Sequence, residues 1–287
     1  MSPRALALNW RIDGRDATAF LVLVGATGSL YLLGAARGNS RDRRGRRWPR
    51  GRSVCFIAGL GVLVVGLYSG IGAQADERLW AHMLEHMVIW VIVAPLLAAG
   101  APVRLAFYSL PRRGRRTLAR WLHSSTVSAI TNPIGSIFLF SAALIVTHLP
   151  AIYGLALSNP YVHETEHGLY LLTSLLVWAP LIGVDPVPHR PGPRGRFAWM
   201  GACMLPMVAI AVWLETAPGS VYSQYLHALG ARALADQHLA ATIMWAGGLP
   251  AFLAPLLAPR LMSVQITPRP SRRLPHSQLT PPTAADH

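Results

Sequence analysis

The chain has 287 residues, of which 52% are hydrophobic and 13% are charged, a composition typical of a membrane protein with several spanning helices. Its net charge is +14, and all 26 basic residues are arginines that gather in short segments between apolar runs. That distribution is typical of membrane topology and argues against nucleic acid as a partner, so the lipid bilayer is the expected surroundings.

Seven apolar runs follow one another along the chain, and each is long enough to cross a bilayer, which takes about 20 helical residues. In chain order they cover residues 17–36, 53–71, 80–100, 126–149, 162–184, 197–217 and 236–258. Four connecting stretches carry turn signals, many prolines or a run of arginines and are predicted to be loops, namely 104–120, 151–161, 185–196 and 218–235. The sequence therefore predicts an all-α polytopic membrane protein with seven transmembrane helices.

The arginines also predict the orientation of these helices. Twenty-one of the 26 lie in alternate connecting segments and in the tail, which the positive-inside rule assigns to the cytoplasm. The N-terminus is then outside and the C-terminus cytoplasmic. We expect an external segment at 1–16, a membrane domain at 17–258 and a disordered cytoplasmic tail at 259–287. The heavier positive charge follows the first run, which favours a spanning helix over a signal peptide.

Histidines recur at one level of this topology, at the outer ends of the helices. His82 and His86 lie one helical turn apart, and so do His163 and His167. Two further candidates stand alone at helix ends, His148 and His238. Ionisable side chains inside a membrane are costly, so a functional site is the first hypothesis. If their helices are neighbours, these side chains converge.

The residues around the histidines indicate which metal ion the site would bind. Met83 and Met87 form a second pair one turn apart, and imidazole with thioether suits copper, whereas imidazole with carboxylate suits zinc or iron. We expect copper, with Glu85, Glu166 and Asp236 holding the imidazoles in orientation. The two cysteines stand alone in apolar runs, so a thiolate site is not expected.

Two catalytic alternatives and one non-metal alternative stay open. His163, Glu164 and His167 match the HExxH pattern of zinc proteases, in which the glutamate is the general base. His86 with His167 could ligate a haem from two helices. The protease pattern comes without an assignable third zinc ligand, and a haem would not need the remaining histidines. The histidine level could also dock a partner protein without binding metal.

Several motifs share their order and spacing with one known family. They are His82-Met-Leu-Glu-His86, Ala94-Pro95, Gly100-Ala-Pro102, Glu166-His167, Trp178 to Pro186, Asp236-Gln237 and Met244-Trp245. Over residues 79–251 the chain resembles the multi-span bacterial cytochrome c oxidase assembly factors of the CtaG type. It departs from them at Glu85, where many members carry glutamine, and at Gly247-Gly248, where an acidic residue is common.

The resemblance implies a function as well as a fold. It implies about seven helices in the bacterial plasma membrane and a non-enzymatic role in maturing haem–copper oxidases, with a part in copper supply. The expected partners are cytochrome c oxidase subunits and a periplasmic copper carrier.

Overall fold

The computed structural model of the chain describes residues 15–41 and 47–261, and over these residues it is helical without strands, as the sequence predicts. The predicted external segment 1–16 and tail 259–287 lie almost entirely outside the described residues.

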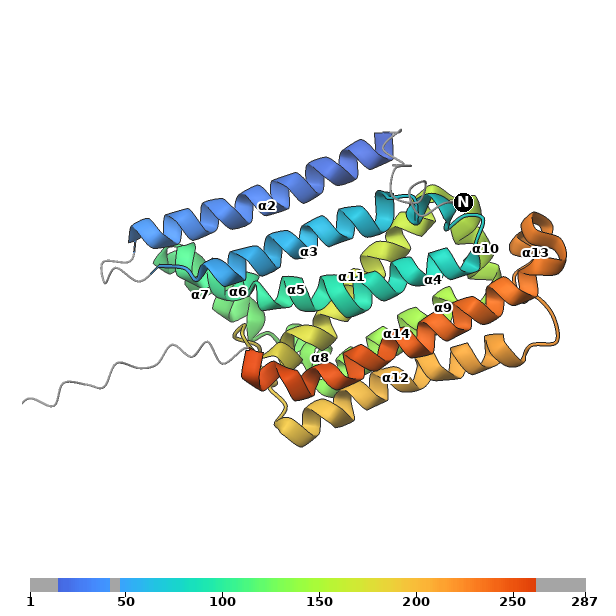
Figure 1. Cartoon of the computed structure of the whole chain (residues 1–287). Helices are drawn as coiled ribbons and strands as arrows, with labels where there is room; N and C mark the ends of the chain where they lie inside the picture. Colours follow the sequence, from blue (N-terminus) through green and yellow to red (C-terminus); the bar gives the residue numbers. More distant parts are fainter. Residues whose placement is uncertain (1–14, 42–46, 262–287) are drawn as a thin grey trace, which may run out of the picture.

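The first half of the chain forms three long rods and the short helices that follow them (Figure 1). Its elements are α2 (Arg15–Arg41), α3 (Arg50–Tyr68), the 3-10 turn η1 (Gly72–Gln74), α4 (Leu79–Val88), the π-helical turn η2 (Ile89–Val93), α5 (Ala94–Ala99), α6 (Pro102–Ser109) and α7 (Arg112–Leu122). The third rod is α4, η2 and α5 in line.

The second half completes the bundle. Its elements are α8 (Ser125–Thr131), α9 (Pro133–Thr147), α10 (Pro150–Ser158), α11 (Pro160–Ile182), α12 (Pro193–Thr216), α13 (Ser223–Leu229), the 3-10 turn η3 (Gly230–Arg232) and α14 (Ala233–Leu261). The long helices run side by side, with α6 and α7 at one end of the bundle and α10 and α13 at the other (Figure 1). Helix α14 packs on α12 and α4, while α11 packs on α5 and α9.

Four helical stretches of the described chain are long and apolar enough to cross a membrane, namely Ala17–Ser40, Arg50–Gln74, Leu79–Ser109 and Arg194–Thr216. The pair α8 and α9 makes a fifth if it counts as one span, although it bends by 67°. The bend has a local cause, because Pro133 begins α9 and the Asn132 side chain accepts the Gly135 N–H at 2.8 Å. Seven spans and the orientation of the termini stay predictions.

Three of the four predicted loops are wrong, because they contain helices. Residues 104–120 hold most of α6 and α7, residues 151–161 hold most of α10, and residues 218–235 hold α13. In α10 the proline stands at the first helical position, where its missing N–H has no intrahelical partner to lose, so it starts the helix instead of breaking it. The fourth stretch is non-helical as far as Gly192, where prolines are dense.

The third rod contains a π-helical turn that proline explains. The Ala94 N–H bonds to the Ile89 carbonyl five residues back, and Pro95 has no N–H to offer the next carbonyl, that of Trp90. The Trp178 indole of α11 donates to that carbonyl instead, at 2.8 Å. This bond ties α11 to the rod immediately below the histidines.

Candidate metal centre

Two adjacent helices supply the four paired histidines. Helix α4 carries His82 and His86, and α11 carries His163 and His167. The ring centroids are 4.5 Å apart within the α4 pair and 4.4 Å apart within the α11 pair. Across the helices His82 stacks on His163 at 5.0 Å, and His86 meets His167 edge-on at 5.6 Å. The structure thus brings all four imidazoles into one closed ring of neighbours.

Ligand atoms within this ring are close enough to share an ion. One set is His82, His86 and His163, and the other is Glu85, His163 and His167; within each set the ligand atoms all lie within 4.8 Å of one another. A tetrahedral ion with bonds of about 2.0–2.1 Å needs nitrogens about 3.4 Å apart. Small side-chain rotations therefore suffice, and His163 belongs to both sets.

Burying these ring nitrogens without hydrogen bonds costs free energy. His82 is fully buried, and His86 and His167 are about 5% exposed. Among the described residues, neither ring nitrogen of these three side chains has a hydrogen-bond partner. A buried polar group left unsatisfied costs about 1–3 kcal/mol, so a cation that accepts nitrogen lone pairs would stabilise this arrangement.

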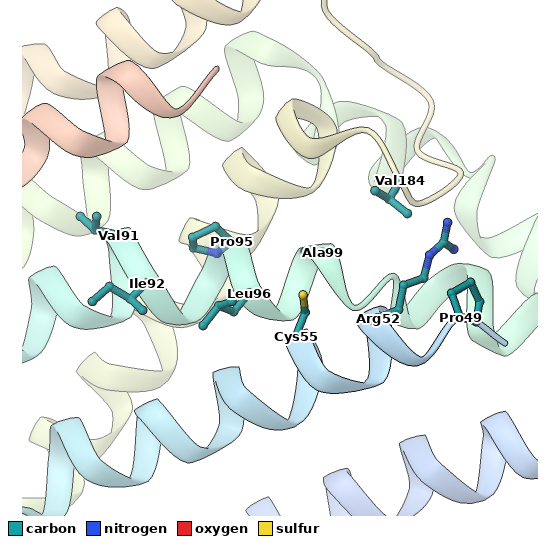
Figure 2. Close-up of a pocket in the computed structure, with 10 residues that line it drawn as sticks. Pro49, Arg52, Cys55, Val91, Ile92, Pro95, Leu96, Ala99 and Val184 are labelled. Carbon is teal, nitrogen blue, oxygen red and sulfur yellow. The ribbon is translucent and has the colours of Figure 1, made fainter. Parts of the chain in front are cut away.

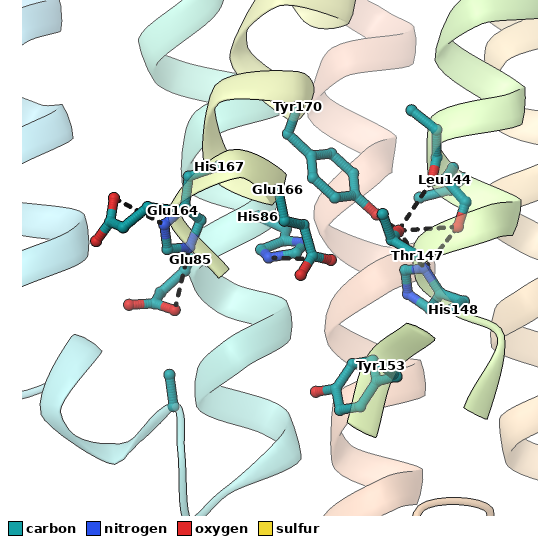
Figure 3. A network of polar contacts seen from close by, with 12 residues as sticks. Glu85, His86, Leu144, Thr147, His148, Tyr153, Glu164, Glu166, His167 and Tyr170 are labelled. Atoms are coloured by element: carbon teal, nitrogen blue, oxygen red, sulfur yellow. Dashed lines mark hydrogen bonds and ion pairs between the residues drawn. The ribbon is translucent and has the colours of Figure 1, made fainter. Parts of the chain in front are cut away.

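Carboxylates border the imidazoles at ion-pair distance (Figure 3). Glu85 Oε2 lies 3.7 Å from His167 Nε2, and Glu166 Oε1 lies 3.9 Å from His86 Nε2. Glu164 Oε2 lies 3.9 Å from the other nitrogen of His167. Glu85 and Glu166 thus lie where carboxylates can orient imidazoles. Glu164 lies among them too, although the predicted orienting set is Glu85, Glu166 and Asp236.

His148 lies beside the four histidines, with one ring nitrogen available to a metal ion. Its Nδ1 lies 2.8 Å from the Leu144 carbonyl, as a donor would, which leaves Nε2 with a free lone pair. Tyr170 packs on the ring of His86 at 4.2 Å, and its hydroxyl bonds to Thr147 at 2.7 Å (Figure 3). An imidazole oriented by a backbone carbonyl is common among metal ligands.

The thioethers line a small cavity of about 10 Å³ next to the ring, about the size of one water molecule. Met83 and Met87 of α4 reach it, together with His86 and His148. Met207 of α12 and Met244 of α14 complete the sulfur side. The sequence argument did not single out Met207, which stands in the middle of an apolar helix with no signal to mark it.

The structure does not bring Asp236 and His238 to the cluster. The Asp236 carboxylate accepts the Leu79 N–H at 2.7 Å and lies 3.9 Å from Arg78, so it caps the start of α4 instead of orienting an imidazole. His238 makes none of the ring contacts or ion pairs that join the other histidines within the described part of the chain. A residue two positions from a capping side chain is displaced by about 200° around the helix.

Tyrosines in or next to the short helices α10 and α13 close the centre on that side. Tyr153 lies 4.9 Å from the ring of His82, stacks on Tyr222 at 4.0 Å and bonds to the Tyr225 hydroxyl at 2.9 Å. Burial raises the pKa of Tyr222 and of Tyr225, so both stay neutral. The Tyr222 hydroxyl donates to the His148 carbonyl at 3.0 Å. Sequence reasoning missed this layer because it took α10 and α13 for loops.

Comparison with known proteins decides the family. Residues 29–261 match the profile of the cytochrome c oxidase caa3 assembly factors. The chain belongs to this family. The resemblance that its motifs predicted is thereby confirmed.

Relatives of the chain include uncharacterized proteins of three mycobacteria. Those of Mycobacterium bovis and Mycobacterium tuberculosis are 29% identical to it over 248 residues, and that of Mycobacterium leprae is 27% identical over the same length. The match covers 82% of this chain but 36% of each relative, so the chain spans about a third of their length. No solved structure matches it.

Several of the motifs that predicted the resemblance build joints between helices. The Trp178 indole donates to the Trp90 carbonyl of the π-helical turn, which Pro95 leaves without an N–H partner. Asp185 accepts the Arg104 N–H at 2.7 Å at the start of α6, just after Ala101, a buried residue with φ of 53°. Gln237 bridges the Val221 N–H and the Leu214 carbonyl. The histidine motifs and the joints therefore have separate roles.

Proposed function

We propose that this assembly factor helps to mature a haem–copper cytochrome c oxidase by holding copper transiently in its buried centre. The observation that carries the proposal is the ring of four imidazoles, with thioethers on one side and carboxylates on the other. The copper is cargo, received and passed on to an oxidase subunit or a periplasmic copper carrier.

The topology in the proposal keeps seven spans. They are α2, α3, the α4–α5 rod, the bent pair α8–α9, α11, α12 and α14. Helices α11 and α14, of 23 and 29 residues, are long enough to span and are packed among the others. With 21 of 26 arginines at one end, the N-terminus is outside, the C-terminus is cytoplasmic and the histidine centre is near the outer face of the plasma membrane. A reporter fused after His287 should read as cytoplasmic, and a C-terminus found outside would overturn this arrangement.

Reduced copper suits the donor set better than zinc or haem. Thioethers are soft ligands that favour copper over zinc, and two of them, Met83 and Met87, share a helix with His82 and His86. A porphyrin would have to enter between rings 4.4–5.6 Å apart, which are already in contact. Glu164 is engaged with His167 and also accepts from the Tyr68 hydroxyl at 3.4 Å, which disfavours a protease base.

The residues divide the work between binding and orientation. The imidazoles and thioethers bind the ion. Glu85 and Glu166 orient the imidazoles they face by accepting a hydrogen bond from an imidazole N–H. The tyrosine layer keeps water from the centre, and release toward the outer face requires α10 and α13 to move, since these helices carry the layer.

Copper binding by the purified full chain tests the site. The double variants His82→Ala/His86→Ala and His163→Ala/His167→Ala should each lose copper under reducing conditions. The control variant His123→Ala/His189→Ala should keep its copper. These two histidines are not part of the cluster, since His123 follows the last residue of α7 and His189 lies in the loop before α12. Equal copper retention in all three variants would leave the histidines as a docking surface.

A deletion strain tests the biological role. Loss of the gene should lower the activity and copper content of the assembled oxidase while its subunits are still made, and added copper should partly restore both. Normal oxidase copper and activity in the deletion strain would contradict the assembly role. A Soret band from the purified protein would instead indicate haem.

A further inference from the structure

A second cavity, lined by none of the histidines, extends toward the arginine-rich end of the bundle. It is a groove of about 610 Å³ between α3, the α4–α5 rod and the segment after α11 (Figure 2). Arg52 and Cys55 of α3 line it, with Val91, Ile92, Pro95 and Leu96 of the rod. Apart from one guanidinium, this wall is almost entirely apolar.

The groove has the length of an acyl chain within one leaflet. Its lining residues on the rod run from Val91 to Ala99, a rise of about 12 Å along the helix, and one leaflet of hydrocarbon is about 15 Å thick. Ile92 is 43% exposed, so the groove is open on its side. Val91 and Ile92 belong to the π-helical turn, so the same distortion that frees the Trp90 carbonyl shapes this wall.

The charged end of the groove is suited to an anion. The Arg52 guanidinium lies 5.2 Å from the centre of the Trp48 ring, which holds it in place by a cation–π contact. Arg104 and Asp185 are both within electrostatic range of Arg52. Two guanidiniums thus face one carboxylate, which is engaged with the N–H groups of Val103 at 3.4 Å and Arg104 at 2.7 Å, so positive charge prevails. A guanidinium fork is the side-chain geometry that best fits a phosphate.

We propose that the groove binds one anionic phospholipid, with its phosphate at Arg52 and one acyl chain along the row from Ala99 to Val91. The site is independent of copper handling, and only its assignment to the cytoplasmic leaflet rests on the proposed orientation. The chain's own residues 262–287 are a poorer occupant, because they carry Arg269, Arg272 and Arg273 and would bring like charge to Arg52.

Native mass spectrometry of the full chain in detergent tests the proposal, with phosphatidylglycerol and phosphatidylcholine as probes. The wild-type chain should retain one phosphatidylglycerol and hold it more tightly than phosphatidylcholine. Arg52→Gln should weaken phosphatidylglycerol binding about fivefold, the loss expected for one basic side chain facing an anionic lipid. Ala99→Phe should weaken the binding of both lipids, because its ring would occupy the path of the acyl chain.

A matched control distinguishes lipid binding in the groove from non-specific attraction of an anionic lipid to surface arginines. Arg50 is exposed, begins the same helix and is not part of the lining, so Arg50→Gln should leave lipid retention unchanged. Each variant is first compared with the wild type by its melting temperature and elution volume, and Ala99→Phe keeps the test valid if Arg52→Gln fails to fold.

Three outcomes would overturn the proposal. One is an equal loss of binding in Arg50→Gln and Arg52→Gln, and another is equal retention of the two lipids by the wild type. The third is a wild-type chain that binds no lipid until residues 262–287 are removed, which would make that segment the occupant.

Discussion

Replacing Trp178 with phenylalanine removes a hydrogen bond to the Trp90 carbonyl, and no other donor of the described residues is in place to bond to that carbonyl. The Trp178 indole donates to the Trp90 carbonyl at 2.8 Å, and both side chains are 2–3% exposed. The carbonyl cannot turn to its own helix, because the Ala94 N–H is engaged with Ile89 and Pro95 has no N–H. A buried carbonyl left unsatisfied costs about 1–3 kcal/mol, and measured bonds between membrane helices fall toward the lower end, so we expect about 1–2 kcal/mol.

The structure offers a matched control for the loss of the indole ring. Trp199 is also 3% exposed, but its indole nitrogen has no hydrogen-bond partner among the described residues. Trp199→Phe therefore reports the packing loss alone, and Trp178→Phe should cost about 1–2 kcal/mol more. The assay is denaturant unfolding of both variants in the same micelles, and equal costs for the two would refute the reasoning.

A rescue variant sharpens the test. Pro95→Ala restores an N–H at the position that the π-helical turn directs toward the Trp90 carbonyl. The cost of Trp178→Phe should then be smaller by about 1 kcal/mol in the Pro95→Ala background than in the wild type. Simple additivity of the two changes would contradict the proposed cause of the bond.

Two further predictions concern the joint at α6 and the sulfur side of the centre. Burial raises the pKa of Asp185 to about 6, above its usual 3.8, so the folded state holds this proton more tightly than the unfolded chain. Stability should fall as pH rises from about 4 to about 6, and Asp185→Asn should remove that part of the slope in unfolding curves measured beside the wild type. A Cβ at Gly247 would lie 3.1 Å from Met87 Cε, so Gly247→Val should displace this thioether and weaken binding of reduced copper more than of zinc. Gly61→Val, with open space at its Cβ, is the control; equal losses for the two metals would exclude a role for Met87.

The two proposed sites lie in separate regions of the bundle. The candidate metal centre lies at the end closed by α10 and α13, and the groove proposed for lipid lies toward the end occupied by α6 and α7 (Figure 1). A variant that alters one region should leave the other intact, so copper and lipid binding can be measured as independent properties of the same protein.

Local patterns in the sequence were sufficient to predict the helices and the histidine pairs. An apolar run of bilayer length is recognisable without its neighbours, and His82 with His86 share a face because a helix repeats every 3.6 residues. Family membership also follows from the order and spacing of local motifs. The same locality explains why loops were wrongly predicted, because stretches with many arginines or with turn signals, such as α7 and α10, become helical where one face packs on the bundle.

Tertiary structure alone decided which side chains meet. His82 and His163 are 81 positions apart, and only the packing of α4 beside α11 stacks their rings at 5.0 Å. Packing likewise assigns Asp236 to the first turn of α4 and brings Met207 to the sulfur side. Helical periodicity fixes the face on which a residue lies, whereas the partner of that face depends on how long helices with similar apolar surfaces fit together, and no single stretch of sequence carries that information.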